Sequence, residues 1–278
     1  GYKVAPNQTV YEVGTDEEGS ETRTEFSKLG ARKAILNDLC PSATFIAYNY
    51  NTPVDVEAFE QEANRILREV EEECGWMYET YHTDGKTKGR INYTVWSDVY
   101  VCPDCAREVV FWEAAVDKQA GKVMKEFPCP HCNVTLTKKN MERAWVTNHD
   151  RAIDQTIRQA KQVPVLISYS VNKKRYEKKP DDFDLNLIDK IQNAEIPYWF
   201  PTDPIPQGDK TGEPHRIGIT HAHHFYTKRN LWELTALNDR LRGKVRVAFQ
   251  SVVSTLSSRL VRYNLGNRGN GPLSGTLY

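Results

Sequence analysis

The clearest pattern of apolar and polar positions lies at residues 55–74, where hydrophobic side chains recur every three or four positions. This spacing places them on one face of an α-helix, and a series of glutamates occupies the other face. We therefore predict an amphipathic helix with one buried and one solvated side. The apolar positions are Val56, Phe59, Ala63, Ile66, Leu67, Val70 and Cys74, and the acidic positions are Glu57, Glu60, Glu62, Glu69, Glu71 and Glu72.

Shorter apolar segments predict strands along the first two thirds of the chain. Residues 2–11 alternate around Pro6-Asn7 as in a hairpin, and an acidic loop follows at residues 16–21. Pro41 and Ser42 open a helix that continues to residue 50. Further strands are predicted at residues 33–37, 76–82, 90–101, 109–112, 123–127, 142–147 and 163–171.

The last third of the chain predicts helices on either side of a proline-rich connector. One helix is expected at residues 182–193, and the connector carries Pro197, Pro201, Pro204 and Pro206 before a glycine-containing loop at 208–212. A second helix begins at Thr227 and ends at Gly243, and a third is expected over residues 245–263. Residues 264–278 predict a loop.

The composition is that of a folded protein, with 39% hydrophobic and 27% charged residues. No run approaches the ~18 apolar residues of a membrane span, and no apolar segment near Gly1 resembles a signal peptide. We therefore expect a cytoplasmic protein with no membrane partner.

The net charge of zero conceals a segregation of charge along the chain. Residues 1–80 carry a net charge of −9, and residues 118–179 and 228–278 carry +9 and +7. Such a distribution can steer a polyanion onto one face, whereas basic runs also occur on ordinary solvated surfaces. Neutrality therefore does not exclude a nucleic-acid partner.

Four of the six cysteines form two Cys-x-x-Cys pairs, Cys102 with Cys105 and Cys129 with Cys132. Two such pairs place four thiolates around one Zn²⁺, and all four positions are then filled by protein, as in a structural site. Disulfides are disfavoured because nothing indicates secretion, and a redox dithiol needs one pair only. We interpret Cys40 and Cys74 as buried small hydrophobes, and His131 as a surface residue.

Asp38 follows the apolar segment at residues 33–37. A carboxylate at the end of a parallel strand lies where nucleotide-type ligands bind in open α/β sheets. The alternative is a cap for the helix that follows, which is the commoner role for such a residue.

Basic residues gather at two places that suit phosphate contacts. The first is a run with Tyr176 at its centre, at the end of the strand at 163–171, and the second is the start of the helix at Thr227. The predicted DNA-contacting residues are Lys173, Lys174, Arg175, Lys178, Lys179, Lys228 and Arg229.

Three histidines, His221, His223 and His224, lie close together in sequence. They are not spaced as on a metal-binding helix, and no acidic residue lies at a matching spacing. We interpret them as structural or phosphate-contacting rather than as a second metal site.

The segment FSKLGARKAILNDLCPSATFIA at residues 26–47 resembles a stretch of prokaryotic DNA methyltransferases. These enzymes use S-adenosylmethionine to methylate adenine N6 or cytosine N4, and some carry an inserted zinc ribbon. The cysteine pairs, the strand at 164–169, the basic run and the segment at 223–231 are similar to that inserted region. The resemblance implies that Asp38 binds the ribose of S-adenosylmethionine and that the zinc-bearing region grips DNA.

Two motifs of that family are missing from the chain. The glycine-rich cofactor loop is absent before Asp38, and no Pro-Pro pair occurs to form the catalytic (Asp/Asn)-Pro-Pro-(Tyr/Phe) tetrapeptide. The chain therefore resembles an internal piece of such an enzyme, with no catalytic residue to assign. Its partners would be DNA and the remaining parts of the methyltransferase, or other restriction or defence subunits.

These patterns predict an α/β fold: a partial Rossmann-like methyltransferase sheet, an inserted zinc-ribbon β module and a C-terminal helical segment. The expected divisions are a cofactor-domain part at 1–54, a helix and strands at 55–96, the zinc ribbon at 97–140, a basic β/α region at 141–200 and a connector with helices at 201–278. The alternative to the methyltransferase is a non-enzymatic zinc-ribbon module that binds nucleic acid or another protein.

Overall fold

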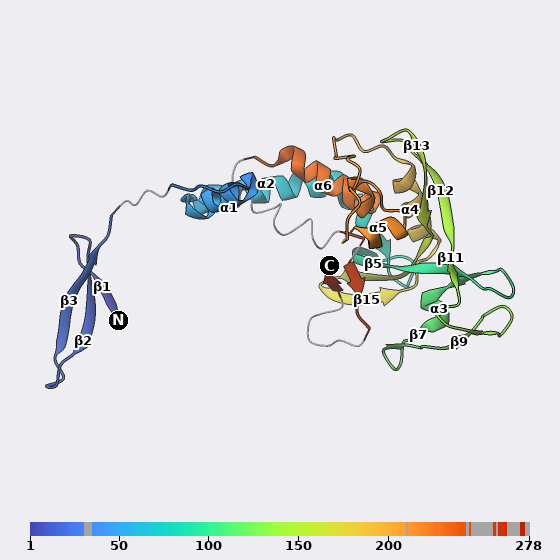
Figure 1. The fold of residues 1–278 in the computed structure, drawn as a ribbon, viewed down its shortest axis with the longest axis horizontal. Helices are drawn as coiled ribbons and strands as arrows, with labels where there is room; N and C mark the ends of the chain where they lie inside the picture. The colour runs from blue at the N-terminus through green and yellow to red at the C-terminus, as the bar shows by residue number, and fades with distance from the viewer. Residues whose placement is uncertain are drawn as a thin grey trace. The chain divides into compact units, whose positions relative to one another are not determined.

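The structure is a computed structural model that describes residues 1–30, 35–209, 211–242, 245, 258–259, 261–265 and 273–275. Its contacts divide the chain into two compact units, Gly1–Pro53 and Val54–Tyr278 (Figure 1).

The first unit contains an antiparallel sheet of three strands in the order β1-β2-β3. The predicted hairpin at Pro6-Asn7 is confirmed, and the Asn7 side chain accepts a hydrogen bond from the N–H of Thr9 at 3.1 Å. The acidic loop at Asp16 connects the second hairpin, where the Asp16 carboxylate accepts from the N–H of Ser20 at 2.8 Å. The strands are β1 (Tyr2–Val4), β2 (Thr9–Thr15) and β3 (Glu21–Lys28).

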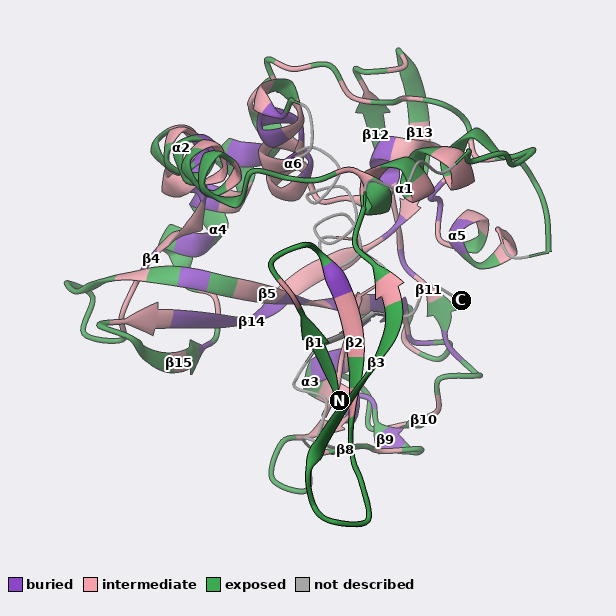
Figure 2. Ribbon diagram, turned by 90° about the vertical axis from the view of Figure 1, so that its left-hand side faces the viewer, coloured by how far each residue is buried: buried purple, intermediate pink, exposed green. Residues whose placement is uncertain are grey.

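Helix α1 (Pro41–Asn51) begins at the proline that predicted it, but the strand before it does not form at residues 35–37. Residues 33–34 lie outside the described residues. Ile35 is 98% exposed, and no described strand runs beside residues 35–37 to pair with their backbone. The strands and α1 are mostly exposed or half-buried, and the unit has few buried side chains (Figure 2).

Strand β5 (Lys88–Val101) is the centre of the largest sheet in the second unit, which has the order β11-β5-β14-β15. All of its pairings are antiparallel, and β4 and β6 also pair with β5. The sheet keeps apolar side chains such as Ile91, Ile167 and Tyr169 buried. The remaining strands are β4 (Glu79–Tyr81), β6 (Glu108–Val110), β11 (Glu142–Arg143), β14 (Gln162–Val171) and β15 (Lys174–Lys178).

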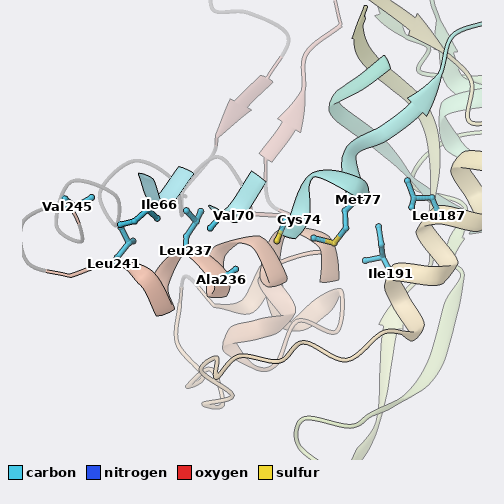
Figure 3. Close-up of a cluster of buried hydrophobic side chains, with 10 residues drawn as sticks. All are labelled: Ile66, Val70, Cys74, Met77, Leu187, Ile191, Ala236, Leu237, Leu241 and Val245. Carbon is cyan, nitrogen blue, oxygen red and sulfur yellow. The ribbon is translucent and has the colours of Figure 1, made fainter. Parts of the chain in front are cut away.

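The amphipathic helix is confirmed as α2 (Val56–Cys74), and it packs against α6 (Lys228–Arg240) and α4 (Asp182–Asn193). Figure 3 shows that buried side chains from all three helices and from Met77 of the short helix η1 (Gly75–Tyr78) make up one core. Thr227 caps α6 through its hydroxyl, and Asp181 caps α4 with a capping box. The core consists of Ile66, Val70, Cys74, Met77, Leu187, Ile191, Ala236, Leu237, Leu241 and Val245.

The region between the cysteine pairs folds into short elements. Its predicted first strand ends early, because residues 111–115 turn into a short helix that buries Trp112 and Ala115. These elements are α3 (Phe111–Ala115), β7 (Val116–Asp117), β8 (Lys122–Val123) and β9 (Phe127–Pro128), and β10 (Thr135–Leu136) follows the second cysteine pair. The pairs β7-β8 and β9-β10 are both antiparallel.

A separate hairpin joins β12 (Trp145–Asp150) to β13 (Gln155–Ala160), and the proline-rich connector leads through α5 (Gly212–Arg216) to the short helix η2 (Ala222–Phe225). The prediction of a helix at 245–263 is wrong at its C-terminal end. Residues 261–263 form β16 (Val261–Tyr263), since they pair with β17 (Leu273–Gly275) in the segment predicted as a loop. Residues 246–257 lie outside the described residues.

The fold is therefore mixed α/β with several small antiparallel sheets. All strand pairs among the described residues are antiparallel, and a Rossmann-like parallel sheet is not among them. None of the described helices combines the length and the hydropathy that a bilayer crossing requires.

Candidate metal centres and the basic hairpin

The two cysteine pairs lie in turns with the same backbone hydrogen bonds. The N–H of Ala106 donates to the carbonyl of Cys102 at 3.0 Å, and the N–H of Asn133 donates to the carbonyl of Cys129 at 3.0 Å. Ala106 and Asn133 both have positive φ, 55° and 61°, which curls the chain back after each pair. The two pairs therefore present their sulfurs in the same way.

The four thiols converge. The Sγ atoms of Cys102 and Cys132 lie 3.8 Å apart, those of Cys105 and Cys129 lie 3.9 Å apart, and all four lie within 4.8 Å of one another. A disulfide needs ~2.05 Å, so the cysteines are not bonded to each other. Four sulfurs around a tetrahedral ion with bonds of ~2.3 Å are separated by about 3.8 Å, so the cluster can bind a metal ion in a closed, all-protein site.

This four-cysteine site is built into the core of the ribbon. Cys102 and Cys129 are fully buried beside Phe127 and Leu136. His131 is not a ligand: its ring Nε2 lies 3.0 Å from the carbonyl oxygen of Glu108. A bound ion would therefore replace part of the hydrophobic core that so small a module lacks.

The two remaining cysteines differ. Cys74 is buried in the helical core, as predicted, and burial raises the pKa of its thiol to about 12. Cys40 is exposed, so its prediction as a buried residue is wrong. It lies directly before α1, where no described side chain covers it.

Asp38 is placed in an exposed turn. Its Oδ1 accepts a hydrogen bond from the N–H of Cys40 at 2.8 Å, which orders the chain just before α1. Cys40 occupies the N-cap position of α1, so Asp38 lies two residues before the cap and is not itself the helix cap. The structure brings no second polar side chain of the described residues onto this carboxylate to form a cofactor pocket.

The basic run forms the tip of the hairpin between β14 and β15. Asn172 and Lys173 are its two turn residues, and both have positive φ, 48° and 67°. This is the backbone of a tight I′ turn, which normally takes Asn-Gly. Lys173, Lys174 and Arg175 are exposed, and within the described part of the chain none of the three forms an ion pair. We call residues 172–175 the basic hairpin tip.

Lys178 and Lys179 do not belong to this free group. The side chain of Lys178 is 6% exposed, and its Nζ lies 2.5 Å from Asp181 and 2.8 Å from the buried Asp184. Although burial alone would lower the pKa of Lys178, the hydrogen bonds to both carboxylates outweigh it and the pKa is raised. Lys179 is exposed and lies 2.6 Å from Glu113. Lys178 therefore stabilises the fold.

Lys228 and Arg229 lie at the start of α6, as predicted, and both are half-buried. Lys228 donates to the carbonyl of Gln192 at 2.9 Å. The Arg229 guanidinium lies 5.3 Å from the centre of the Tyr78 ring, and burial lowers its pKa. Arg229 therefore packs against the interior rather than extending into solvent.

The histidine segment meets an acidic residue that lies far away in sequence. Asp150 ends β12, and its Oδ2 lies 2.7 Å from the Nε2 atoms of both His223 and His224. The three side chains are almost fully covered, with exposures of 11%, 8% and 4%. We call these three residues the Asp150–histidine cluster.

Two contacts place this cluster. The N–H of Ala160 on β13 donates to the carbonyl of Ile217 at 3.0 Å, which joins the chain before η2 to the hairpin that carries Asp150. The next residue, Gly218, has φ of +81°, and a Cβ there would lie 2.2 Å from the carbonyl oxygen of Arg158. No side chain fits at this position, so glycine is required for the close approach.

The protonation states of the cluster are set by burial and by the shared hydrogen bonds. Burial would raise the pKa of Asp150, but hydrogen bonds from His224 and His223 hold it below its ordinary value. Burial lowers the pKa of His224, and this outweighs the attraction of Asp150. A neutral imidazole beside an ionised carboxylate results.

The cluster borders a large cleft of about 2120 Å³ in the second unit, together with Arg151, Lys228 and much of β5. Small-molecule pockets usually measure ~300–1,000 Å³, so this cleft is large enough for an extended ligand. Asp150 is the residue that sequence reasoning missed. It lies 73 positions before His223, and no local spacing relates the two.

No protein-family model, no curated protein and no solved structure matches the chain. The site is therefore interpreted from its own geometry.

Proposed function

We propose that the chain is a zinc-stabilised DNA-binding region of an S-adenosylmethionine-dependent DNA methyltransferase that methylates adenine or cytosine amino groups. The four-cysteine site would hold Zn²⁺, since thiolate ligands in tetrahedral array favour that ion. The basic hairpin tip would contact the phosphates of DNA.

The observation that carries the DNA-binding part is the basic hairpin tip. Lys173 occupies a left-handed turn position that glycine would fill without strain, and a side chain there costs on the order of 1 kcal/mol. At this position the chain has a lysine in place of the glycine that would relieve the strain, and two more cations without an ion pair among the described residues follow it. Strain of this kind at a charged residue is typical of a contact to an anionic partner. The cleft, which exceeds a small-molecule pocket, agrees with a polymeric ligand.

The methyltransferase part is supported by the resemblance at residues 26–47, in which Asp38 would bind the cofactor ribose. The first unit has apolar side chains that stay exposed, as a surface that packs against other parts of an enzyme would have. Those exposed residues include Phe26, Leu29, Phe45, Ile46 and Tyr48.

The test is the substitution Lys173→Gly. It is expected to raise the free energy of unfolding by up to about 1 kcal/mol, because strain is removed, and to weaken binding to duplex DNA, because a phosphate contact is lost. Asn133→Gly is the matched control, since it relieves a similar backbone in the ribbon without removing a charge. Unchanged DNA affinity in Lys173→Gly would contradict the proposal.

The enzymatic part has its own measurement. We expect the chain by itself to transfer no methyl group from labelled S-adenosylmethionine to DNA, because it lacks the tetrapeptide that holds the target amine. Methyl transfer by the isolated chain would overturn this assignment of roles.

A further inference from the structure

Two imidazoles share one carboxylate oxygen in the Asp150–histidine cluster. Each Nε2 atom lies 2.7 Å from Asp150 Oδ2, and the two rings are centred 4.2 Å apart. With no ion between them, both Nε2 atoms must carry a proton to donate to that oxygen. This forces both histidines into the same tautomer.

That tautomer leaves a polar atom unsatisfied. The Nδ1 atom of His223 is buried and has no hydrogen-bond partner among the described residues. An ion on Nε2 would leave a proton on this same Nδ1 atom, so His223 Nδ1 is unpaired with or without an ion.

We propose that Asp150, His223 and His224 form a site for one divalent transition-metal ion, separate from the four-cysteine site. Imidazole nitrogen and carboxylate oxygen together suit Zn²⁺, Mn²⁺, Fe²⁺ or Ni²⁺ rather than the oxygen-only ions Mg²⁺ and Ca²⁺. The ligand atoms lie within 4.8 Å of one another and belong to almost fully covered side chains.

The distances are close to those that a metal requires. Two ligand atoms at ~2.1 Å from one ion and at right angles are about 3.0 Å apart, so each 2.7 Å separation must widen by about 0.3 Å. Rotation of the side chains is sufficient for a change of that size.

Each imidazole can keep its proton when an ion binds, because the proton can move from Nε2 to Nδ1. Metal binding takes the Nε2 lone pairs, so a neutral imidazole then carries its proton on Nδ1. For His224 the hydroxyl oxygen of Thr220 lies 3.4 Å from Nδ1 and can accept that proton's hydrogen bond. The N–H of Thr220, 3.3 Å from the same atom, favours the ion-free tautomer, so the ion competes with it.

The site is three-coordinate with respect to protein. Among the described residues no fourth His, Cys, Asp or Glu ligand atom joins the group. Three protein ligands with open positions are typical of metals that bind water or a ligand, in contrast to the closed four-cysteine site. The three ligand residues line a cleft together with Lys228 and Arg151, so an anionic group such as a phosphate is the ligand class that fits.

The test is titration of the metal-stripped full chain with Co²⁺ near neutral pH. We expect two equivalents to bind: one gives the intense thiolate-to-cobalt absorption of the four-cysteine site, and the second does not. Excess Mg²⁺ should not displace the second equivalent. This test does not depend on DNA binding.

Variants then locate the second ion. His223→Gln and Asp150→Asn should weaken the second equivalent at least about tenfold while the thiolate absorption, which reports the folded ribbon, stays unchanged. His221→Gln is the matched control, because the Nδ1 atom of His221 lies 3.0 Å from the Thr220 hydroxyl and its ring is outside the cluster. It should keep both equivalents.

Two results would overturn the proposal. One is uptake of a single equivalent by the unsubstituted chain, which shows that the cluster is a hydrogen-bonded structural unit. The other is retention of the second equivalent at full affinity in both His223→Gln and Asp150→Asn. The first result requires no variant and therefore does not depend on whether a substituted chain folds.

Discussion

Lys178 and Lys179 are adjacent in sequence, yet the structure gives them different environments. The Lys178 ammonium is almost fully covered and bonded to Asp181 and Asp184, and Asp184 in turn accepts from the Thr80 hydroxyl at 2.6 Å. Lys179 remains exposed beside Glu113. In the sequence both lysines belong to one basic run. Their difference could not be predicted, because the burial of one lysine depends on carboxylates at the start of the following helix.

We predict that Lys178→Met lowers the free energy of unfolding by about 3 kcal/mol, because it leaves the buried Asp184 without its cation. Lys179→Met is the matched control, and it should cost less than about 1 kcal/mol, since exposed ion pairs contribute little. Chemical denaturation of both variants measures the difference. Equal losses would show that Lys178 is not a structural residue.

The same ion pair also predicts how the stability of the fold changes with pH. Because the folded-state pKa of Lys178 is raised above its ordinary value of 10.5, its stabilisation is present below that pH and is lost as the pH rises through the folded pKa. Lys178→Met should lack this alkaline loss.

At the scale of elements, the sequence predicts best what is encoded locally. Helix α2 follows from periodicity, α1 from Pro41 and α6 from Thr227, and all three begin within one residue of the predicted position. The turns of the two cysteine pairs are also local. The strand at 261–263 could not be predicted, because it forms by pairing with residues 273–275. The Asp150–histidine cluster was missed for the same reason: its side chains meet through the contact of two distant segments.

The four-cysteine site predicts that the zinc-ribbon region at 97–140 depends on its cysteines for folding. Cys102→Ser should lose the cysteine-bound zinc and, with it, the order of the short elements between Cys102 and Leu136, since a structural ion supplies ~10–16 kcal/mol to such modules. The core of α2, α4 and α6 should remain folded. Metal content and limited proteolysis measure the two effects.

Cys40→Ser is the matched control for that experiment. Cys40 is exposed and outside the four-cysteine site, so this variant should keep its zinc and its resistance to protease. A Cys102→Ser chain that retains the cysteine-bound zinc would contradict the assignment of ligands.

For the whole molecule, charge distribution is more informative than total charge. The net charge is zero, but residues 118–179 carry +9, and three cations of that segment lie at one hairpin tip, where they have no ion pair within the part of the chain that the structure describes. The acidic excess of residues 1–80 is carried mainly by helix α2 of the second unit, whereas the first unit is marked by exposed apolar residues. The sequence predicted the basic segment. Only the structure shows which three of its cations lie exposed at the hairpin turn.

The most direct test of the proposed function is the affinity of the chain for duplex DNA as a function of salt between 50 and 200 mM. Release of counterions gives a slope of about −0.9 per phosphate contact in a plot of log affinity against log salt. Three contacts from the basic hairpin tip predict a slope of about −3 or steeper, reduced by about 2 in the double variant Lys174→Gln with Arg175→Gln. An affinity independent of salt, or a slope unchanged in that variant, would contradict the account.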